Sequence, residues 1–381
     1  MSAGIRKGER PDVALAVADH PVTVAGVFTR NLVRAAPVAV AAERVRRGVA
    51  RAVLVNAGCA NACTGRPGLD ATLASTSAVA ALLGTEPEAV LPASTGVIGV
   101  VLPHERIVDK AKELVDRLRP DGANDFAEAI LTTDRWTKIA TAEVPANGGT
   151  ATVLGIGKGA GMIHPDVGPP QATMLVFLFT DADVARDALE RALVRACDAT
   201  FNACTVDGDT STNDTVLAFA SGDSGVSVTA SELEPAFVSV CDAIARSMIA
   251  DGEGATHVAE IWVSGLATED AARQVARTVA TSLLVKTALF GRDMNWGRLL
   301  AAAGRAGVPF DPERAVIRVG DVEIVRDGLA VGLEAEQRAT QILGEPTYRI
   351  ELVLGTGPGR ARYLTSDLGH GYVDVNAGYR S

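Results

Sequence analysis

The segment GPPQATMLVFLFT, residues 168–180, joins a turn to a strand. The glycine and prolines at its start favour a turn, whereas the run from Met174 to Thr180 is apolar and rich in residues that favour strands. Thr173 stands where the two meet. Because a β-branched threonine is common at the start of a strand, the simplest interpretation of Thr173 is structural.

Further strands and helices surround this segment on both sides. Apolar residues at helical spacing and capping residues indicate helices, and short runs of small and β-branched residues indicate strands. There is no fixed repeat and no low-complexity linker, so the chain predicts an α/β (α+β) fold with helix and sheet layers throughout. The predicted strands are 12–19, 21–29, 51–56, 151–156, 174–180, 258–266, 315–326, 348–354 and 371–375. The predicted helices are 70–84, 107–118, 183–197 and 231–251, the last with a capping box of Ser231 and Glu234.

Composition and charge exclude several classes of protein. The chain has 381 residues, of which 48% are hydrophobic and 22% charged, a balance typical of globular proteins. Its formal net charge of −10 is a poor match for nucleic acid or anionic lipid. No apolar run is long enough to span a bilayer, the first residues do not form a secretory signal, and the five cysteines suit a reducing compartment. We therefore expect a cytoplasmic protein with no membrane or nucleic-acid partner.

The glycine-rich segment GIGKGAG, residues 155–161, does not match a nucleotide-binding loop. Lys158 is followed by Gly159 rather than by Ser or Thr, and Ala160 occupies the third glycine position of the dinucleotide motif. Two interpretations stay open. The segment is either a turn with several residues at positive φ, or a close backbone approach to a ligand with Lys158 as a cationic anchor.

Metal-binding and serine-hydrolase patterns are absent from the sequence. The acidic segment VDGDTSTND, residues 206–214, has Thr212 where a calcium loop needs glycine, and no glutamate closes it. The five histidines are scattered, and Cys59 and Cys63 have no second pair with which to complete a zinc site. No G-x-S-x-G motif is present either. We predict no metal.

Thr173 has a second interpretation, which is chemical. A hydroxyl held against the carbonyl of the preceding residue can attack it, and water then opens the resulting ester. The new N-terminal threonine places an α-amine, with a pKa of about 7.7–8.0, beside its own hydroxyl. Nucleophile and base then come from one residue, a known alternative to a Ser-His pair.

Several long segments resemble one enzyme family and favour the chemical interpretation. The chain resembles the glutamate N-acetyltransferase / ornithine acetyltransferase family of arginine biosynthesis, whose members are self-processing enzymes with an N-terminal threonine. The matching segments run in family order from the first quarter of the chain to its last residue. They are STGVIGVVLP (94–103), ILTTD (130–134), GKGAGMIHP (157–165), ATMLVFLFTDA (172–182), TVDGDTSTNDT (205–215), DGEGAT (251–256), LVKTALFGRDMNWGRLLAAAGRAG (284–307) and VNAGYRS (375–381).

The resemblance implies a division of the chain and a set of site residues. Self-cleavage between Ala172 and Thr173 would give an α chain of 1–172 and a β chain of 173–381, with a smaller C-terminal α/β lobe from about 285 to 381. The implied fold is the layered helix/sheet sandwich of the self-processing ornithine acetyltransferases. Thr95 and Gly96 match the pair that forms the oxyanion hole. The implied substrate contacts are Thr133, Lys158, Thr173, Glu253, Asn376 and Ser381.

The reaction implied by the resemblance is a two-step exchange. Thr173 takes acetyl from N2-acetyl-L-ornithine, and glutamate then takes it from the acetyl-threonine, which is ping-pong kinetics. No metal or organic cofactor is expected, while acetyl-CoA stays open as a further co-substrate, and the expected assembly is an (αβ)2 heterotetramer. Two alternatives also stay open. One is a self-processing amidase or aminopeptidase that uses water as the acyl acceptor, and the other is an inactive amino-acid-binding protein.

Overall fold

The computed structural model describes residues 1–165, 167–168 and 174–378, which form two compact units. Within those ranges, unit 1 comprises residues 1–202 and 209–248, and unit 2 comprises residues 203–208 and 249–378. Residues 285–378 of the expected C-terminal lobe lie in unit 2, which also includes residues 203–208 and 249–284. The predicted cleavage site, Ala172–Thr173, lies outside the described residues.

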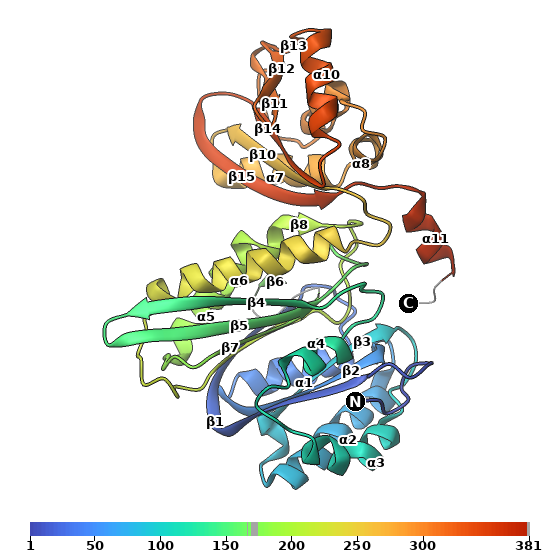
Figure 1. Cartoon of the computed structure of the whole chain (residues 1–381), viewed down its shortest axis with the longest axis vertical. Coiled ribbons are helices and arrows are strands. Elements are labelled where there is room, and N and C mark those ends of the chain that lie inside the picture. Colours follow the sequence, from blue (N-terminus) through green and yellow to red (C-terminus); the bar gives the residue numbers. More distant parts are fainter. Residues whose placement is uncertain (166, 169–173, 379–381) are drawn as a thin grey trace. The chain divides into compact units, whose positions relative to one another are not determined.

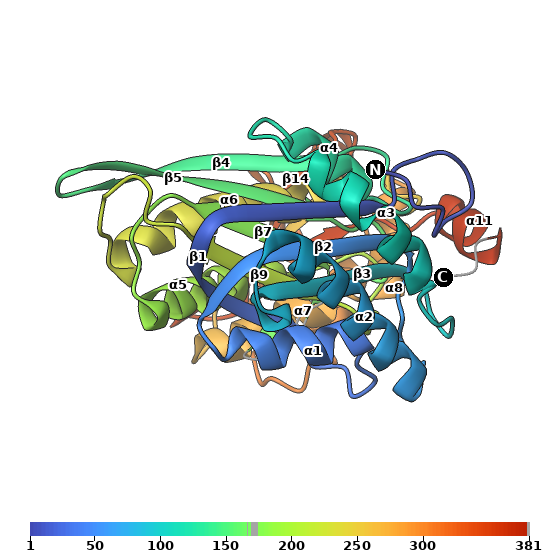
Figure 2. The same cartoon turned by 90° about the horizontal axis from the view of Figure 1, so that it is seen from below.

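Unit 1 is built on one mixed sheet, whose long first strand curves through it (Figure 2). The strand order is β3-β2-β1-β9-β7-β5-β4, and β6 pairs with β1. The neighbours β2/β3 and β7/β9 are parallel, and the other pairs are antiparallel. The strands are β1 (Val13–Thr29), β2 (Val49–Cys59), β3 (Val90–Val97), β4 (Lys138–Ala146), β5 (Gly149–Lys158), β6 (Val167–Gly168), β7 (Leu175–Thr180) and β9 (Thr215–Ala220).

Helices cover both faces of this sheet. Val53 and Val55 of β2 pack into one core with residues of α1 and α4, whereas Ala52 and Leu54 pack into another with α2 and α3. The alternation follows from the strand period of two. The helices of unit 1 are α1 (Ala36–Val45), α2 (Gly65–Leu83), α3 (His104–Asp116), α4 (Ala123–Ala129), α5 (Arg186–Ala199) and α6, which runs over Ala230–Ala250 to the unit boundary. This confirms the predicted layered α/β fold class.

The glycines of GIGKGAG let α6 pack closely against β5. A Cβ atom on Gly155 would lie 2.3 Å from Cγ1 of Val240, and one on Gly157 would lie 2.7 Å from Cγ2 of Ile244. Residues 155–158 are therefore the end of a strand, and the interpretation of the whole segment as a turn is wrong for them. Only Gly159 and the later Met162 have positive φ in the region, at 158° and 54°.

Unit 2 is a second, smaller α/β layer structure (Figure 1). Its seven-stranded sheet has the order β13-β12-β11-β14-β10-β15-β8, and Ile261 and Val263 of β10 face a core shared with α7. Its strands are β8 (Cys204–Thr205), β10 (Val258–Gly265), β11 (Val316–Val319), β12 (Val322–Arg326), β13 (Leu329–Ala330), β14 (Thr347–Val353) and β15 (Gly357–Ser366). Its helices are α7 (Glu269–Ala280), α8 (Leu283–Phe290), α9 (Trp296–Gly304), α10 (Leu333–Ile342) and α11 (His370–Gly378). No helix in the described part of the chain is both long and apolar enough to cross a membrane.

Five local predictions were wrong. Residues 315–326, expected as one strand, form the antiparallel pair of β11 and β12. Residues 12–19 and 21–29 form one strand with a register shift between Val17 and Val22, and residues 371–375 lie in helix α11. Helix α2 begins at Gly65 rather than at 70, although it ends as predicted before Gly84. The capping box of α6 is made by Thr229 and Glu232, because the Glu232 side chain accepts from the Thr229 backbone N–H at 2.8 Å.

The close packing at β5 gives a test of stability. Gly155→Ala should lower the free energy of unfolding by about 1–3 kcal/mol, because the added methyl overpacks the contact with Val240. Gly304→Ala, in the last turn of α9 with open space around it, is the matched control and should be neutral or stabilising by about 0.5–1 kcal/mol. Urea unfolding of the two variants and the parent checks this. Equal effects from both substitutions would contradict the packing argument.

Candidate active site

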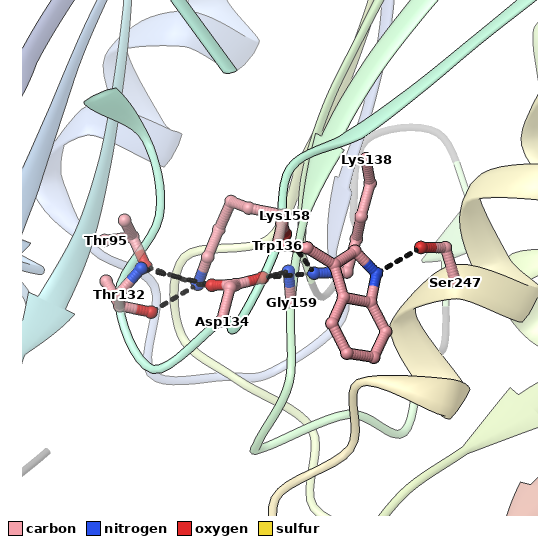
Figure 3. Close-up of polar contacts among 8 residues, drawn as sticks. All are labelled: Thr95, Thr132, Asp134, Trp136, Lys138, Lys158, Gly159 and Ser247. Atoms are coloured by element: carbon pink, nitrogen blue, oxygen red, sulfur yellow. Dashed lines mark hydrogen bonds and ion pairs between the residues drawn. The ribbon is translucent and has the colours of Figure 1, made fainter. Parts of the chain in front are cut away.

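A buried aspartate in unit 1 holds two lysines from neighbouring strands (Figure 3). Lys138 begins β4 and Lys158 ends β5, and these strands pair so that Lys138 lies opposite Gly157. Lys138 Nζ donates to Asp134 Oδ1 at 2.7 Å, and Lys158 Nζ lies 3.9 Å from Asp134 Oδ2. The backbone N–H groups of Gly159 and Thr132 donate to the same carboxylate at 2.7 and 3.1 Å.

These contacts keep Asp134 ionised. Burial alone would raise the pKa of this carboxyl group, but the charges of Lys158 and Lys138 and the hydrogen bonds from Lys138 and Thr132 outweigh it. Together they lower the pKa of Asp134 from 3.8 to about 2. The side chains of Asp134 and Lys138 are fully buried, so the pair is a structural ion pair as well as part of a site.

The ammonium group of Lys158 points toward two threonine hydroxyls, as Figure 3 shows. It donates to Thr132 Oγ1 at 2.9 Å and to Thr95 Oγ1 at 3.2 Å. Thr95 comes from β3, and Thr132 from the loop before β4. The structure thus brings together Lys158 and Thr95, two of the residues expected at the site.

Gly96 follows Thr95 where β3 runs closest to β2. Its φ is 127°, and a Cβ atom there would lie 2.4 Å from the carbonyl carbon of Gly58 and 2.6 Å from the amide nitrogen of Cys59. The two strands are parallel, with Gly96 opposite Gly58. A side chain at this position is therefore excluded by both the backbone angle and the space.

Asn213 and Asp214 directly precede β9, and Asn213 contacts Ser94, the residue before Thr95. The side-chain amide of Asn213 donates to the carbonyls of Ala60 and Ser94, at 2.6 and 2.8 Å, which ties β9 to the end of β3. Asp214 is 3% exposed, and its Oδ2 has no hydrogen-bond partner in the described part of the chain. Burial raises the pKa of Asp214 well above its usual value, although a hydrogen bond from Ser211 and the charge of Lys158 act in the opposite direction. The shift favours the neutral form of this carboxyl group.

Asp214 also lies beside the beginning of β7. The backbone N–H of the next residue, Thr215, donates to the carbonyl of Met174 at 2.5 Å, and Thr215 pairs with Leu175 in the parallel ladder. Met174 is the first described residue after Thr173, the predicted nucleophile.

In unit 2 the structure brings together Glu253 and Asn376. The Asn376 side chain donates to Glu253 Oε2 at 2.8 Å. The loop that carries Glu253 reaches helix α11 through Gly254, whose φ is 71° and where a Cβ atom would lie 2.2 Å from the amide nitrogen of Tyr372. A glycine at 254 is what lets the two segments touch.

The remaining predicted residues are placed less fully. Ala172, Thr173 and Ser381 lie outside the described residues. Thr133 is half-buried, and the hydroxyl that meets Lys158 belongs to its neighbour Thr132. Sequence reasoning missed Thr132, Asp134, Lys138 and Asp214. The sequence does hint at one ion pair, because Asp134 and Lys138 have opposite charges and are four residues apart. The same spacing is found in exposed ion pairs, so it does not predict that this pair is buried.

Comparisons of sequence with known proteins extend over the whole chain, and the comparison of structure covers about half of it. The model of the ArgJ family matches residues 1–381. The arginine biosynthesis bifunctional protein ArgJ of Desulfotalea psychrophila is 46% identical over 387 residues, covering 100% of this chain and 98% of that protein. The protein of the same name from Nitratidesulfovibrio vulgaris is 45% identical over 385 residues, covering 100% and 97%. The crystal structure of arginine biosynthesis bifunctional protein ArgJ from Bacillus halodurans is similar at 37% identity and a TM-score of 0.51, covering 53% of this chain and 98% of that one.

The ionisation of Asp134 gives a pH-dependent stability. Its folded pKa of about 2 lies below its ordinary 3.8, so its contribution is present above the ordinary value and is lost as pH falls through the folded value. Asp134→Asn should therefore lower the free energy of unfolding at pH 7, by about 2 kcal/mol from the lowered pKa of Asp134. The difference in free energy of unfolding between the parent and Asp134→Asn should narrow as pH falls from 4 to 2.

The measurement is urea unfolding of parent and variant across that pH range. Asp109→Asn, at an exposed position of α3, is the control and should follow the parent at every pH. A gap for Asp134→Asn that stays constant from pH 7 to pH 2 would show that ionisation of Asp134 is not its cause.

Proposed function

Because this chain belongs to the ArgJ family and is thereby an acyltransferase of arginine biosynthesis, we propose that it moves an acetyl group from N2-acetyl-L-ornithine to L-glutamate. The observation that carries the proposal is the contact of Lys158 with the Thr95 hydroxyl, next to Gly96. A cation in contact with a hydroxyl donor, next to a backbone amide, can stabilise an oxygen that becomes negatively charged during acyl transfer.

The charge balance around Lys158 supports the same chemistry. Two ammonium groups, of Lys138 and Lys158, surround the single carboxylate of Asp134, so these three side chains carry one more positive than negative charge in a buried region. Burial raises the pKa of the nearby Asp214, which disfavours a second carboxylate there. Buried charges are stabilised by a partner of opposite sign, so an anionic group of the substrate or of the reaction intermediate is favoured there.

We infer that the chain first cleaves itself. The Thr173 hydroxyl oxygen attacks the carbonyl carbon of Ala172, the bond from that carbon to the Thr173 nitrogen breaks, and the nitrogen takes a proton to become a free amine. Water then hydrolyses the ester between the two residues. This leaves chains 1–172 and 173–381, the second beginning with a threonine that has its own α-amine as base.

The acetyl transfer then repeats the attack on a substrate. Thr173 attacks the acetyl carbonyl of N-acetylornithine, Thr95 and Gly96 donate to the oxyanion, and the ornithine α-amine leaves with a proton. The amine of glutamate attacks the acetyl-threonine, forms N-acetylglutamate and releases the Thr173 hydroxyl. Water must be kept from the ester while it waits.

The other site residues would recognise the amino acids. Lys158 is a partner for an α-carboxylate, and Glu253 is an acceptor for an ammonium group, with Asn376 beside it. Thr133 and Ser381 complete the proposed contacts. The proposed enzyme uses no metal or organic cofactor, assembles as an (αβ)2 heterotetramer and works in the cytoplasm.

Replacing Thr173 tests both steps of the proposal. Thr173→Ala removes the attacking oxygen, so the chain should stay whole at 39.4 kDa on a denaturing gel and transfer no acetyl. Thr173→Ser keeps a hydroxyl and is the matched control, which should still be cleaved. Mass spectrometry of the parent caught with N-acetylornithine should find one acetyl group on the peptide that begins at Thr173. Normal fragments from Thr173→Ala would overturn the cleavage step.

Dependence on glutamate separates transfer from hydrolysis. With N-acetylornithine alone, the cleaved enzyme should release about one ornithine per site and then nearly stop, because the acetyl-threonine has no acceptor. Adding glutamate should restore steady release. Continuous ornithine release without glutamate would instead identify an amidase. A parallel assay with acetyl-CoA and glutamate decides whether the enzyme also accepts that donor.

A further inference from the structure

The hydrogen bonds around Lys158 fix the direction of two hydroxyl hydrogens. A lysine ammonium group has three hydrogens and no acceptor, so it must be the donor to both Thr95 and Thr132. A threonine hydroxyl has a single hydrogen, which cannot point at the ammonium group. Within the described residues, neither hydroxyl donates to another group, so both hydrogens stay available to a ligand.

Asp134 sets where that ammonium group lies. The 3.9 Å separation between Lys158 Nζ and Asp134 Oδ2 is an ion pair, but it is longer than a hydrogen bond. The carboxylate therefore attracts Lys158 without taking up its hydrogens. Lys158 itself has a side chain that is only 10% exposed, so little water competes for the same contacts.

Lys138 in turn prevents Asp134 from turning toward Lys158. Its ammonium group donates to Asp134 Oδ1 at 2.7 Å and to the carbonyl of Trp136 at 3.2 Å. The indole N–H of Trp136 donates to Ser247 of α6 at 2.9 Å, which fixes this corner against the helix (Figure 3). Oδ1 is thus occupied by Lys138 and Gly159, and Oδ2 is left to face Thr132 and Lys158.

We propose that Asp134, held by Lys138, is the positioning residue of the acetyl-transfer site, and that Thr132 supplies a second hydroxyl donor beside Thr95. Asp134 keeps the Lys158 ammonium group where it donates to both hydroxyls, and each hydroxyl hydrogen is then directed away from Lys158. A hydroxyl that accepts from a cation is a stronger donor to an anion. This inference rests on the proposed function in one respect. The proposed function identifies the anion as the oxygen of the acetyl carbonyl under attack.

The test compares variants in steady-state transfer from N-acetylornithine to glutamate. Thr132→Val and Asp134→Asn should each lower kcat by about 10–100-fold, because the lost donation matters most when the oxygen is charged. For Thr132→Val, which leaves Lys158 in place, KM should change no more than about threefold. Thr132→Ser keeps the hydroxyl and should stay within about threefold of the parent. Thr137→Val, an exposed threonine of the same loop, is the matched control and should be unchanged.

The double variant distinguishes positioning from mere support of the fold. If Asp134 acts through Lys158 on the hydroxyls, Thr132→Val adds little once Asp134 is replaced, and the double variant is no slower than about threefold below Asp134→Asn. If the fold-reductions in kcat of the two single variants instead multiply in the double variant, the inference is overturned. A kcat of Thr132→Val or Asp134→Asn equal to that of the parent would also overturn it.

Rates are expressed per cleaved chain, as measured on a denaturing gel, since the same donors serve self-cleavage. If Asp134→Asn and Thr132→Val both stay uncleaved while Thr132→Ser and Thr137→Val are processed, the inference is supported at that step. Cleavage of all four at the parent's rate with parental turnover overturns it. Absence of transfer by the parent itself would instead refute the proposed function, which keeps the two failures apart.

Discussion

A carboxylate buried between two ammonium groups is stable only if both of its oxygens are matched, and Asp134 meets that condition with contacts from three separate segments. Lys138 opens β4, Lys158 and Gly159 close β5, and Thr132 belongs to the loop between α4 and β4. The same contacts of Asp134 therefore have two roles. They join the end of a hairpin to its neighbouring loop, and they determine which way the Lys158 ammonium group points.

Local patterns in the sequence were enough for most elements, and they failed where tertiary contacts decide. Buried strands such as β7 and amphipathic helices such as α3 have clear periodicity. The pair His20-Pro21 looks like a turn, yet it lies at an irregularity inside β1, a place where a sheet tolerates proline. Residues 371–375 alternate like a strand but belong to a helix with no buried residue, so no core face was there to give a helical signal.

In the candidate site, too, some residues could be predicted from the sequence, and others depend on tertiary contacts. Thr95, Gly96 and Lys158 lie in segments distinctive enough to be matched by resemblance, and the structure brings Thr95 and Lys158 into contact. Asp134 and Lys138 were missed because their importance comes from burial, which the pairing of β4 with β5 creates. The same four-residue spacing on an exposed loop would be an ordinary solvated ion pair. Asp214 was missed for a related reason, since its raised pKa results from burial, which the sequence does not show.

The strand order of unit 1 bears on what a break after Ala172 does to the molecule. Both halves contribute to one sheet, because β9 and β7 of the later half lie between β1 and β5 of the earlier half. Separating the halves would break the backbone hydrogen bonds of the β1/β9 and β5/β7 pairs and expose apolar residues of the sheet. If the chain is cut after Ala172, as proposed, the two halves would stay joined through the backbone hydrogen bonds of one sheet, and the covalent link would not be needed once folding is finished. A cut and denatured sample would then have to reassemble an interleaved sheet from two separate polypeptides.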